Sequence, residues 1–202
     1  MGAAVGAPDG AAVGAAVCVW GFSTFTGCPS LNVHDLAVQP GYRGRGIGRL
    51  LLEEVERKVL SWRWRLKGRV HRLRQVHGDF HPYNILFRQG DDFTVLDRSR
   101  GEWGEPADDV TALTGNYLFS SLQARGRLEG PLGDLFHRFW DRYVDRTRDA
   151  EILETAAPFF AFRCLVMASP VWYPSLDESV RRKLFSFTLS ILDAPRFEPG
   201  KV

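Results

Sequence analysis

Two aspartates and an asparagine are the residues of this chain best suited to chemistry. Asp79 lies in the run His77-Gly78-Asp79-Phe80-His81-Pro82-Tyr83-Asn84, and Asp97 follows farther along the chain. An aspartate on a loop can accept the proton of an attacking hydroxyl. An asparagine and a second aspartate can hold Mg²⁺ against the phosphates of a nucleotide. This order of residues predicts phosphoryl transfer, with Asp79 as the base and Asn84 and Asp97 as metal ligands.

A hairpin and a helical region are the elements expected to position these residues. Ile85–Phe87 and Phe93–Leu96 flank the turn-forming run 89–92, which indicates two short antiparallel strands. After Pro106, apolar residues recur at helical spacing nearly to the end of the chain. The stretch 159–167 is apolar almost all round, so this part of the helical region should be buried.

The stretch Val76–Val110 resembles the aminoglycoside phosphotransferase and choline kinase family of small-molecule kinases. The residues that carry the resemblance are His77-Gly78-Asp79, Asn84, Leu96-Asp97 and Gly104-Glu105-Pro106-Ala107-Asp108-Asp109-Val110. With the helices that follow, the resemblance covers roughly residues 68–193. It implies ATP- and Mg²⁺-dependent transfer to a small-molecule hydroxyl, with His77 supporting the catalytic loop and Asp109 anchoring it. Arg98 stands where the family usually carries an aromatic; Arg98 or Arg100 could pair with Asp97 or reach a phosphate.

A second pattern, Arg43-Gly44-Arg45-Gly46-Ile47-Gly48, stands between an expected strand and an expected helix. Residues 11–28 and Leu31–Val38 are strand-like, and Ile47–Val59 has the spacing of an amphipathic helix. Glycines let backbone N–H groups approach a pyrophosphate, and a helix N-terminus adds partial positive charge. The spacing fits neither a kinase glycine-rich loop nor a dinucleotide fingerprint. A turn without any ligand is the remaining alternative.

The segment Leu36–Gly48 resembles the acyl-CoA-binding signature of GNAT-type N-acetyltransferases, whose Arg-x-x-Gly-x-Gly pattern is met by Arg43, Gly46 and Gly48. This resemblance covers roughly residues 12–60 and implies acetyl-CoA as cofactor. A GNAT fold normally continues into further strands after this helix. A kinase-like fold normally begins with a nucleotide-binding sheet that bears a phosphate-gripping lysine, whereas Lys58 and Lys67, the only lysines before Asp79, lie in or after the expected helix.

The expected fold class is an α/β N-terminal segment, with partial GNAT-like strands plus a helix, joined to a mainly helical kinase-like C-terminal lobe with a small β-hairpin. The expected domains are an acyl-CoA-binding segment at 1–60, a basic junction at 61–75 and a helical catalytic lobe at 76–202. The leading hypothesis is an ATP/Mg²⁺-dependent phosphotransferase, which a missing nucleotide lobe would impair. The alternatives are an N-acetyltransferase using acetyl-CoA, or an inactive fusion remnant.

The junction combines Trp62 and Trp64 with many basic residues (Arg63, Arg65, Lys67, Arg69, His71, Arg72 and Arg74). It could face nucleic acid or a polyphosphate, but such a segment is more often a solvated helix face whose tryptophans pack inward. The net charge of the 202-residue chain is only +2, so bulk charge predicts no nucleic-acid partner. The kinase resemblance implies a small-molecule substrate instead. The sequence does not indicate the oligomeric state.

Composition also indicates where in the cell the protein is located. The Ala/Gly-rich start lacks the basic region of a signal peptide, and no apolar run approaches membrane-spanning length. Cys18, Cys28 and Cys164 are widely spaced and fit a reducing environment. We therefore expect a cytoplasmic protein with no membrane partner.

Overall fold

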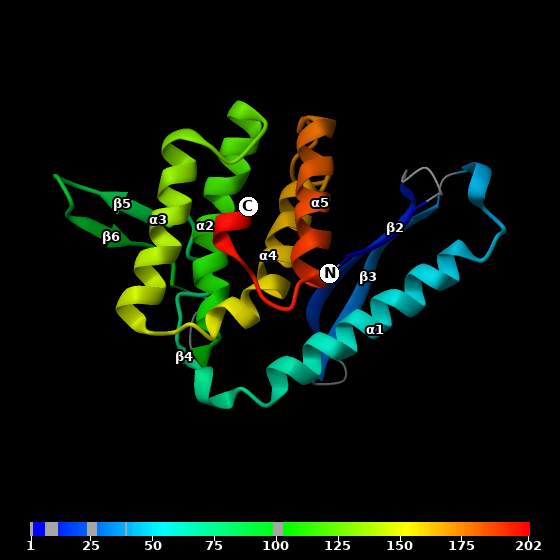
Figure 1. Ribbon diagram of the computed structural model, residues 1–202, viewed down its shortest axis with the longest axis horizontal. Coiled ribbons are helices and arrows are strands. Elements are labelled where there is room, and N and C mark those ends of the chain that lie inside the picture. Colours follow the sequence, from blue (N-terminus) through cyan, green and yellow to red (C-terminus); the bar gives the residue numbers. More distant parts are fainter. Residues whose placement is uncertain (1, 7–11, 24–27, 39, 99–102) are drawn as a thin grey trace. The chain divides into compact units, whose positions relative to one another are not determined.

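The chain forms two compact units, Met1–Gly68 and Arg69–Val202. The computed structural model describes residues 2–6, 12–23, 28–38, 40–98 and 103–202. Figure 1 labels helices and strands of both units where there is room.

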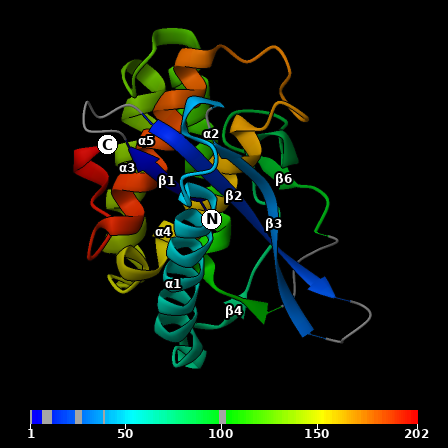
Figure 2. The same ribbon diagram turned by 90° about the vertical axis from the view of Figure 1, so that its right-hand side faces the viewer.

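The first unit is an antiparallel sheet with one long helix. Its strands are β1 (Gly2–Gly6), β2 (Ala12–Ser23) and β3 (Cys28–Val38), in the order β1-β2-β3. The pairing of β2 with β3 runs from Gly14↔Val38 to Ser23↔Cys28, and Figure 2 shows the two strands as a long ribbon. A 3-10 turn, η1 (Pro40–Tyr42), comes before α1 (Ile47–Lys67), which contacts all three strands. The sheet and α1 therefore form two packed layers.

The first unit differs from expectation in one strand and in the length of its helix. The predicted strands correspond to β2 and β3, although residues 24–27 lie outside the described residues, while β1 was not predicted. The helix was expected to end at Val59 but continues to Lys67, because the residues after Val59 include neither glycine nor proline before Gly68. Trp62 is buried as expected, whereas Trp64 is 67% exposed, so the prediction that both tryptophans pack inward is wrong for Trp64.

The second unit contains the predicted helical region. Its helices are α2 (Pro106–Arg125), α3 (Gly130–Thr147), α4 (Ile152–Ala168) and α5 (Glu178–Asp193). Helix α2 packs against α3, α4 and α5, and α4 also packs against α5. At the centre of the core, the ring of Phe197 lies 4.8 Å from that of Phe160 and 5.0 Å from that of Trp140, measured between ring centroids. The prediction of a mainly helical lobe is confirmed.

Short strands and 3-10 helices complete the second unit. The expected hairpin is present as β5 (Ile85–Phe87) paired with β6 (Phe93–Val95), and it projects to one side of the helices in Figure 1. Strand β4 (Arg74–Gln75) pairs with β7 (Trp103–Gly104) in a separate two-stranded sheet. The 3-10 helices are η2 (Val70–Arg72), η3 (Pro82–Asn84) and η4 (Pro199–Lys201).

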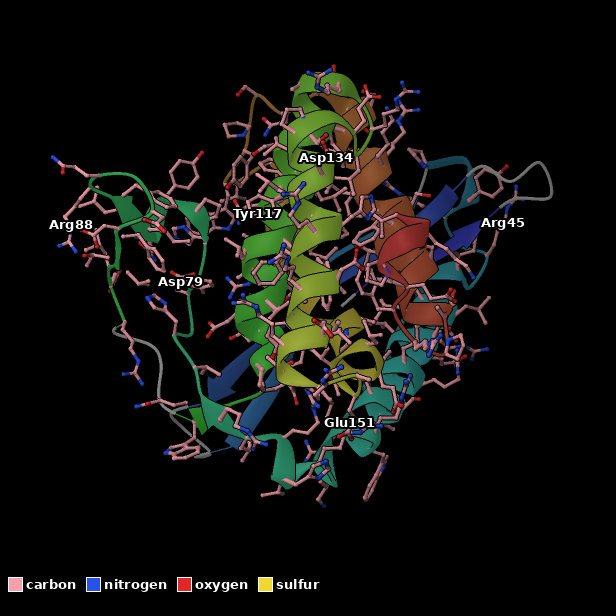
Figure 3. The ribbon with its side chains drawn as sticks, turned by 60° about the vertical axis from the view of Figure 1, so that its left-hand side comes forward. Arg45, Asp79, Arg88, Tyr117, Asp134 and Glu151 are labelled. Atoms are coloured by element: carbon pink, nitrogen blue, oxygen red, sulfur yellow. The ribbon has the colours of Figure 1, made fainter. Side chains whose placement is uncertain are left out.

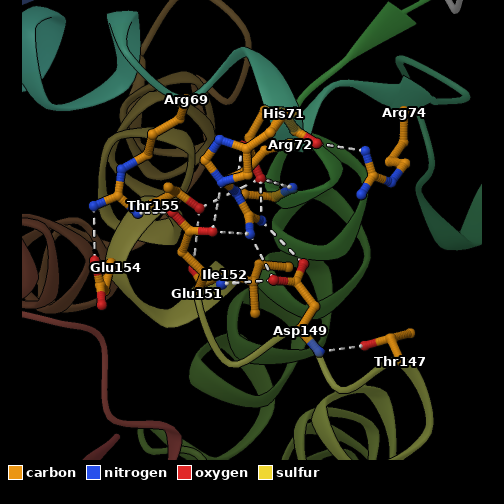
Figure 4. A network of polar contacts seen from close by, with 12 residues as sticks. Arg69, His71, Arg72, Arg74, Thr147, Asp149, Glu151, Ile152, Glu154 and Thr155 are labelled. Carbon is orange, nitrogen blue, oxygen red and sulfur yellow. Dashed lines mark hydrogen bonds and ion pairs between the residues drawn. The ribbon is translucent and has the colours of Figure 1, made fainter.

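An ion-pair network attaches the start of the second unit to its helices (Figure 4). The buried guanidinium of Arg72 donates to both carboxylate oxygens of Glu105 and to those of Asp149. Arg69 donates to Glu151 and to Glu154, each at 2.7 Å. Burial alone would lower the pKa of Arg72, but these carboxylates more than offset it and raise the pKa. Part of the basic junction therefore has a structural role.

Within the described ranges, none of the helices combines the length and the apolar character that crossing a bilayer requires.

Candidate functional site

The glycine loop before α1 has a backbone that favours glycine at two positions. Gly44 and Gly46 have φ angles of 76° and 78°, in the left-handed region that other residues rarely adopt. The carbonyl of Gly46 accepts the N–H groups of Arg49 and Leu50, at 3.0 and 3.1 Å, and so begins the helix. Among the described residues, no side chain caps this helix end and its first turn carries no acidic residue.

This helix end can therefore receive an anion. The N–H groups of Ile47 and Gly48 have no acceptor within the helix, by the geometry of any helix N-terminus, and the helix dipole favours negative charge there. A Cβ built on Gly44 or Gly46 would meet nothing within 4 Å, so the space beside the backbone is open.

Two arginines flank the loop. Nε of Arg43 donates to the carbonyl of Val38 at 3.0 Å, which ties the loop to the end of β3. The guanidinium of Arg45 lies 5.4 Å from the centroid of the Tyr42 ring. Both side chains are exposed, so they add positive charge beside the helix N-terminus.

The second candidate site surrounds the His77-Gly78-Asp79 loop. The carboxylate of Asp109 accepts the backbone N–H of His77 at 2.6 Å and that of Gly78 at 2.8 Å. Nδ1 of His77 accepts the N–H of Asp79 at 3.3 Å, which requires the ring proton on Nε2, and Nε2 lies 2.7 Å from the carbonyl of Leu96. The His77 ring thus joins the loop to the residue that precedes Asp97.

The carboxylate of Asp79 lies between two cationic or titratable side chains. Oδ1 of Asp79 is 3.4 Å from Nη1 of Arg163, on α4, and Oδ2 is 3.8 Å from Nε2 of His81. Arg163 also donates through Nη2 to Asp108 at 3.0 Å. Figure 3 shows Asp79 near the helices, while Arg88 marks the far end of the hairpin. Burial raises the pKa of Asp108; Arg163 partly opposes this shift, and Asp109 and Asp79 add to it.

Asn84 and Asp97 lie at the same end of the hairpin. The backbone N–H of Leu96 donates to the carbonyl of Asn84 at 2.8 Å, so Asp97 follows directly after the residue paired with Asn84. The side-chain amide of Asn84 donates to the carbonyl of Asp79 at 2.9 Å, which leaves its Oδ1 as the atom suited to a cation. Asp97 is exposed and has a φ of 54°, a conformation that aspartate tolerates better than most residues.

These two residues fit part of a Mg²⁺ site. They offer the oxygen ligands that Mg²⁺ prefers, and nucleotide phosphates and water normally supply the others. Among the described residues, no group of three His, Cys, Asp or Glu side chains could hold a metal ion by itself. Binding of a metal ion at these residues would therefore require further oxygen ligands from a bound nucleotide.

For Arg98, the sequence left open a pairing with Asp97 or a contact with a phosphate. The structure gives a different contact, because Nε of Arg98 donates to the carbonyl of Val76 at 3.4 Å. Arg100 lies outside the described residues.

Comparison with known protein families bears on the first candidate site. Residues 4–82 match the model of the acetyltransferase (GNAT) domain. The match begins within β1, includes β2, β3, the glycine loop and α1, and extends through β4 to the His77-Gly78-Asp79 loop. No curated protein and no solved structure matches the chain. The comparisons give no support to the phosphotransferase resemblance, which rests on the residues themselves.

Sequence reasoning did not identify Arg163 as part of the second site. Arg163 is the one charged residue in the apolar stretch 159–167. A lone arginine on a mostly buried helix needs a partner for its charge, because an unpaired buried charge is costly. That signal was present in the sequence, but it could not reveal that the partners are Asp79 and Asp108.

Proposed function

We propose that the chain binds acetyl-CoA at the Arg43–Gly48 loop and acts as a GNAT-type N-acetyltransferase on an amine of a small molecule. The family match over residues 4–82 supports this function. In the reaction, the amine nitrogen would form a bond to the acyl carbon as the thioester bond breaks. The CoA sulfur would leave and take up a proton, giving the free thiol.

The conformation of Gly46 carries the proposal. Its left-handed φ lets the chain turn into α1, whose first N–H groups are capped by no described side chain. Backbone N–H groups at such a turn can bind a pyrophosphate, and Arg43 and Arg45 would add charge. An L-residue at Gly46 would push the loop away from this conformation.

Calorimetric titration with acetyl-CoA tests the proposal on a matched pair of variants. Gly46→Ala places a Cβ on a left-handed residue, whereas Gly41→Ala places one on a neighbouring glycine without a left-handed φ and with equally open surroundings. We expect Gly46→Ala to weaken binding by about tenfold, because left-handed strain costs about 1–2 kcal/mol. Gly41→Ala should bind like the wild type. Absence of acetyl-CoA binding, or equal affinities in both variants, would reject this function.

A second candidate function is ATP-dependent phosphoryl transfer, favoured by the position of Asn84 and Asp97 at one end of the hairpin. These residues would hold Mg²⁺, which would neutralise the nucleotide phosphates. Asp79, held by Asn84 and next to Arg163, would accept the proton of the acceptor hydroxyl.

Titration with ATP in the presence and absence of Mg²⁺ tests this candidate. Binding should require Mg²⁺ and should be lost in Asp97→Ala but kept in Asp92→Ala, whose carboxylate pairs with Arg88. If a phosphorylated acceptor is found, Asp79→Ala should lower turnover by about 10²–10⁴-fold while ATP affinity stays unchanged. If ATP binding depended neither on Mg²⁺ nor on Asp97, the proposed metal site would be excluded.

A further inference from the structure

Two adjoining hollows lie within the second unit. The first, of about 450 Å³, is lined mainly by the apolar side chains of Val76, Phe80, Val95, Val110 and Phe139. The second, also of about 450 Å³, has a mixed lining whose charged residues include His71, Arg72, Arg148 and Asp149. Arg74, Pro106 and Tyr143 line both hollows. A mainly apolar space and a space with charged residues in its walls therefore share these three residues.

Arg74 differs from its neighbours in what its guanidinium contacts. Its Nη1 donates to the backbone carbonyls of His71 and Leu73, at 2.6 and 2.9 Å. In the described part of the chain, Arg74 forms no ion pair with a carboxylate, whereas Arg72 and Arg148 are both paired. Arg74 is exposed, so its charge is available to an anion at the boundary between the hollows.

Tyr143 provides a hydroxyl at the same boundary. Burial, and then the charge of Asp149, raises its pKa to about 12, with smaller effects from Arg72, Glu105 and Arg74. The phenol therefore stays protonated at neutral pH and can donate a hydrogen bond.

We propose that the joined hollows bind an amphipathic monocarboxylate, such as a medium-chain fatty acid. Its apolar body would occupy the first hollow, where burial of apolar surface favours binding. Its carboxylate would accept hydrogen bonds from the guanidinium of Arg74 and the hydroxyl of Tyr143. The volume of each hollow lies within the range of about 300–1,000 Å³ that is usual for small-molecule sites. The nearby carboxylates of Asp149 and Glu151 favour a singly charged ligand over a phosphate dianion.

The first hollow adjoins the second candidate site, because His77 and Asp109 line it, although neither Asp79 nor Asn84 does. No residue of the Arg43–Gly48 loop lines either hollow. A ligand in the first hollow would contact the loop that carries Asp79 without reaching its carboxylate. Binding should therefore reduce hydrogen exchange of the backbone amides in residues 76–84, whichever enzymatic activity the chain has.

Calorimetric titration of the full chain with decanoate, below its micellar concentration, tests the proposal. Decanamide, which has the same tail and no charge, serves as the comparison ligand. We expect one decanoate to bind and decanamide to bind about tenfold more weakly, because a charge-assisted hydrogen bond is replaced by a neutral one. No decanoate binding, or equal affinity for the two ligands, would overturn the proposal.

Substitutions test separately where the carboxylate and the apolar body of the ligand bind. Arg74→Gln and Tyr143→Phe should each weaken decanoate binding, and Val95→Trp should block the rim of the first hollow, where Val95 is 36% exposed. Arg88→Gln, on the hairpin and outside both hollows, should bind decanoate like the wild type. Thermal melting identifies any variant that does not fold. Unchanged decanoate affinity in folded Val95→Trp, or in both folded Arg74→Gln and folded Tyr143→Phe, would show that the ligand lies elsewhere.

Discussion

The carboxylate of Asp109, in the first turn of α2, accepts the backbone N–H of Gly78 across 2.8 Å. Its other oxygen accepts the N–H of His77, so both oxygens hold one turn of the preceding loop. Gly78 has a φ of 83°, which favours glycine at that turn. Asp109 therefore holds the turn that precedes Asp79 through two backbone N–H groups of that turn.

Replacing Asp109 by asparagine should destabilise the second unit. The amide has one acceptor oxygen and presents an NH₂ group to one of the two N–H donors, so one buried bond is lost. We expect a loss of about 1–3 kcal/mol in the free energy of unfolding, measured with urea at neutral pH. Asp108→Asn is the matched control, because Asp108 lies in the same turn, pairs with Arg163 and, in the described part of the chain, accepts no loop N–H. Equal losses in the two variants would show that the loop contacts contribute little.

The hairpin and the helices of the second unit were predictable because their signals are local. Short apolar strands flank a turn-forming run at 89–92, and apolar residues recur at helical spacing after Pro106. Strand β1 was missed because its Gly/Ala-rich sequence has low strand propensity. Its pairing with β2 is a tertiary effect that no local pattern reports. The end of α1 lies beyond Val59 because the change in composition that follows this residue does not interrupt the helix.

The contacts of the candidate sites were predictable only in part. The order of His77, Asp79, Asn84 and Asp97 singled out a loop and a hairpin end, which the structure brings together. Sequence could not show that Arg163 reaches Asp79, because their pairing depends on how α4 packs against α2. The same holds for Arg72, which belonged to a basic junction in the sequence and is a buried ion-pair centre in the fold.

Arg72→Met should be among the most destabilising substitutions in the second unit. Methionine keeps much of the apolar stem but leaves the carboxylates of Glu105 and Asp149 without their shared cation. Breaking a buried pair in this way typically costs about 3–5 kcal/mol. Urea unfolding followed by circular dichroism measures the loss.

A second arginine of the same segment provides the control for this prediction. Arg69 pairs with Glu151 and Glu154, which are more exposed than Glu105. Because exposed ion pairs contribute only about 0–1 kcal/mol, Arg69→Met should lower the free energy of unfolding much less than Arg72→Met does. If both variants lost the same stability, the buried network would not be the anchor described here.

Cys164 should be inert in the native protein. Its side chain is buried in α4, and burial raises the pKa of its thiol to about 12, with a smaller opposing effect from the hydroxyl of Thr188. The reactive thiolate is therefore scarce at mildly alkaline pH. Iodoacetamide labelling followed by peptide mass spectrometry should modify Cys164 in denaturant but not in buffer. Rapid labelling of this peptide under native conditions would contradict the buried position of the thiol.

Asp108 should make the second unit less stable as the pH rises. Its pKa is raised above the ordinary value of 3.8, chiefly by burial and also by Asp109 and Asp79, although Arg163 opposes the shift. The folded protein therefore holds a proton on Asp108 at pH values where the unfolded chain has released it. In that window the unfolded state binds fewer protons, so the contribution of Asp108 to stability falls as the pH increases from about 3.8 to the folded-state pKa.

Asp108→Asn removes this titration while keeping an oxygen that can accept from Arg163. The free energy of unfolding of the variant, relative to the wild type, should increase with pH across that window and then level off. Urea titrations between about pH 3 and pH 7 measure the difference, within the range where carboxyl groups titrate. The exposed Asp134 on α3, labelled in Figure 3, supplies the control, since Asp134→Asn lacks the burial that shifts Asp108. A relative stability of Asp108→Asn that is flat or decreases with pH would show that burial does not dominate the ionisation of Asp108.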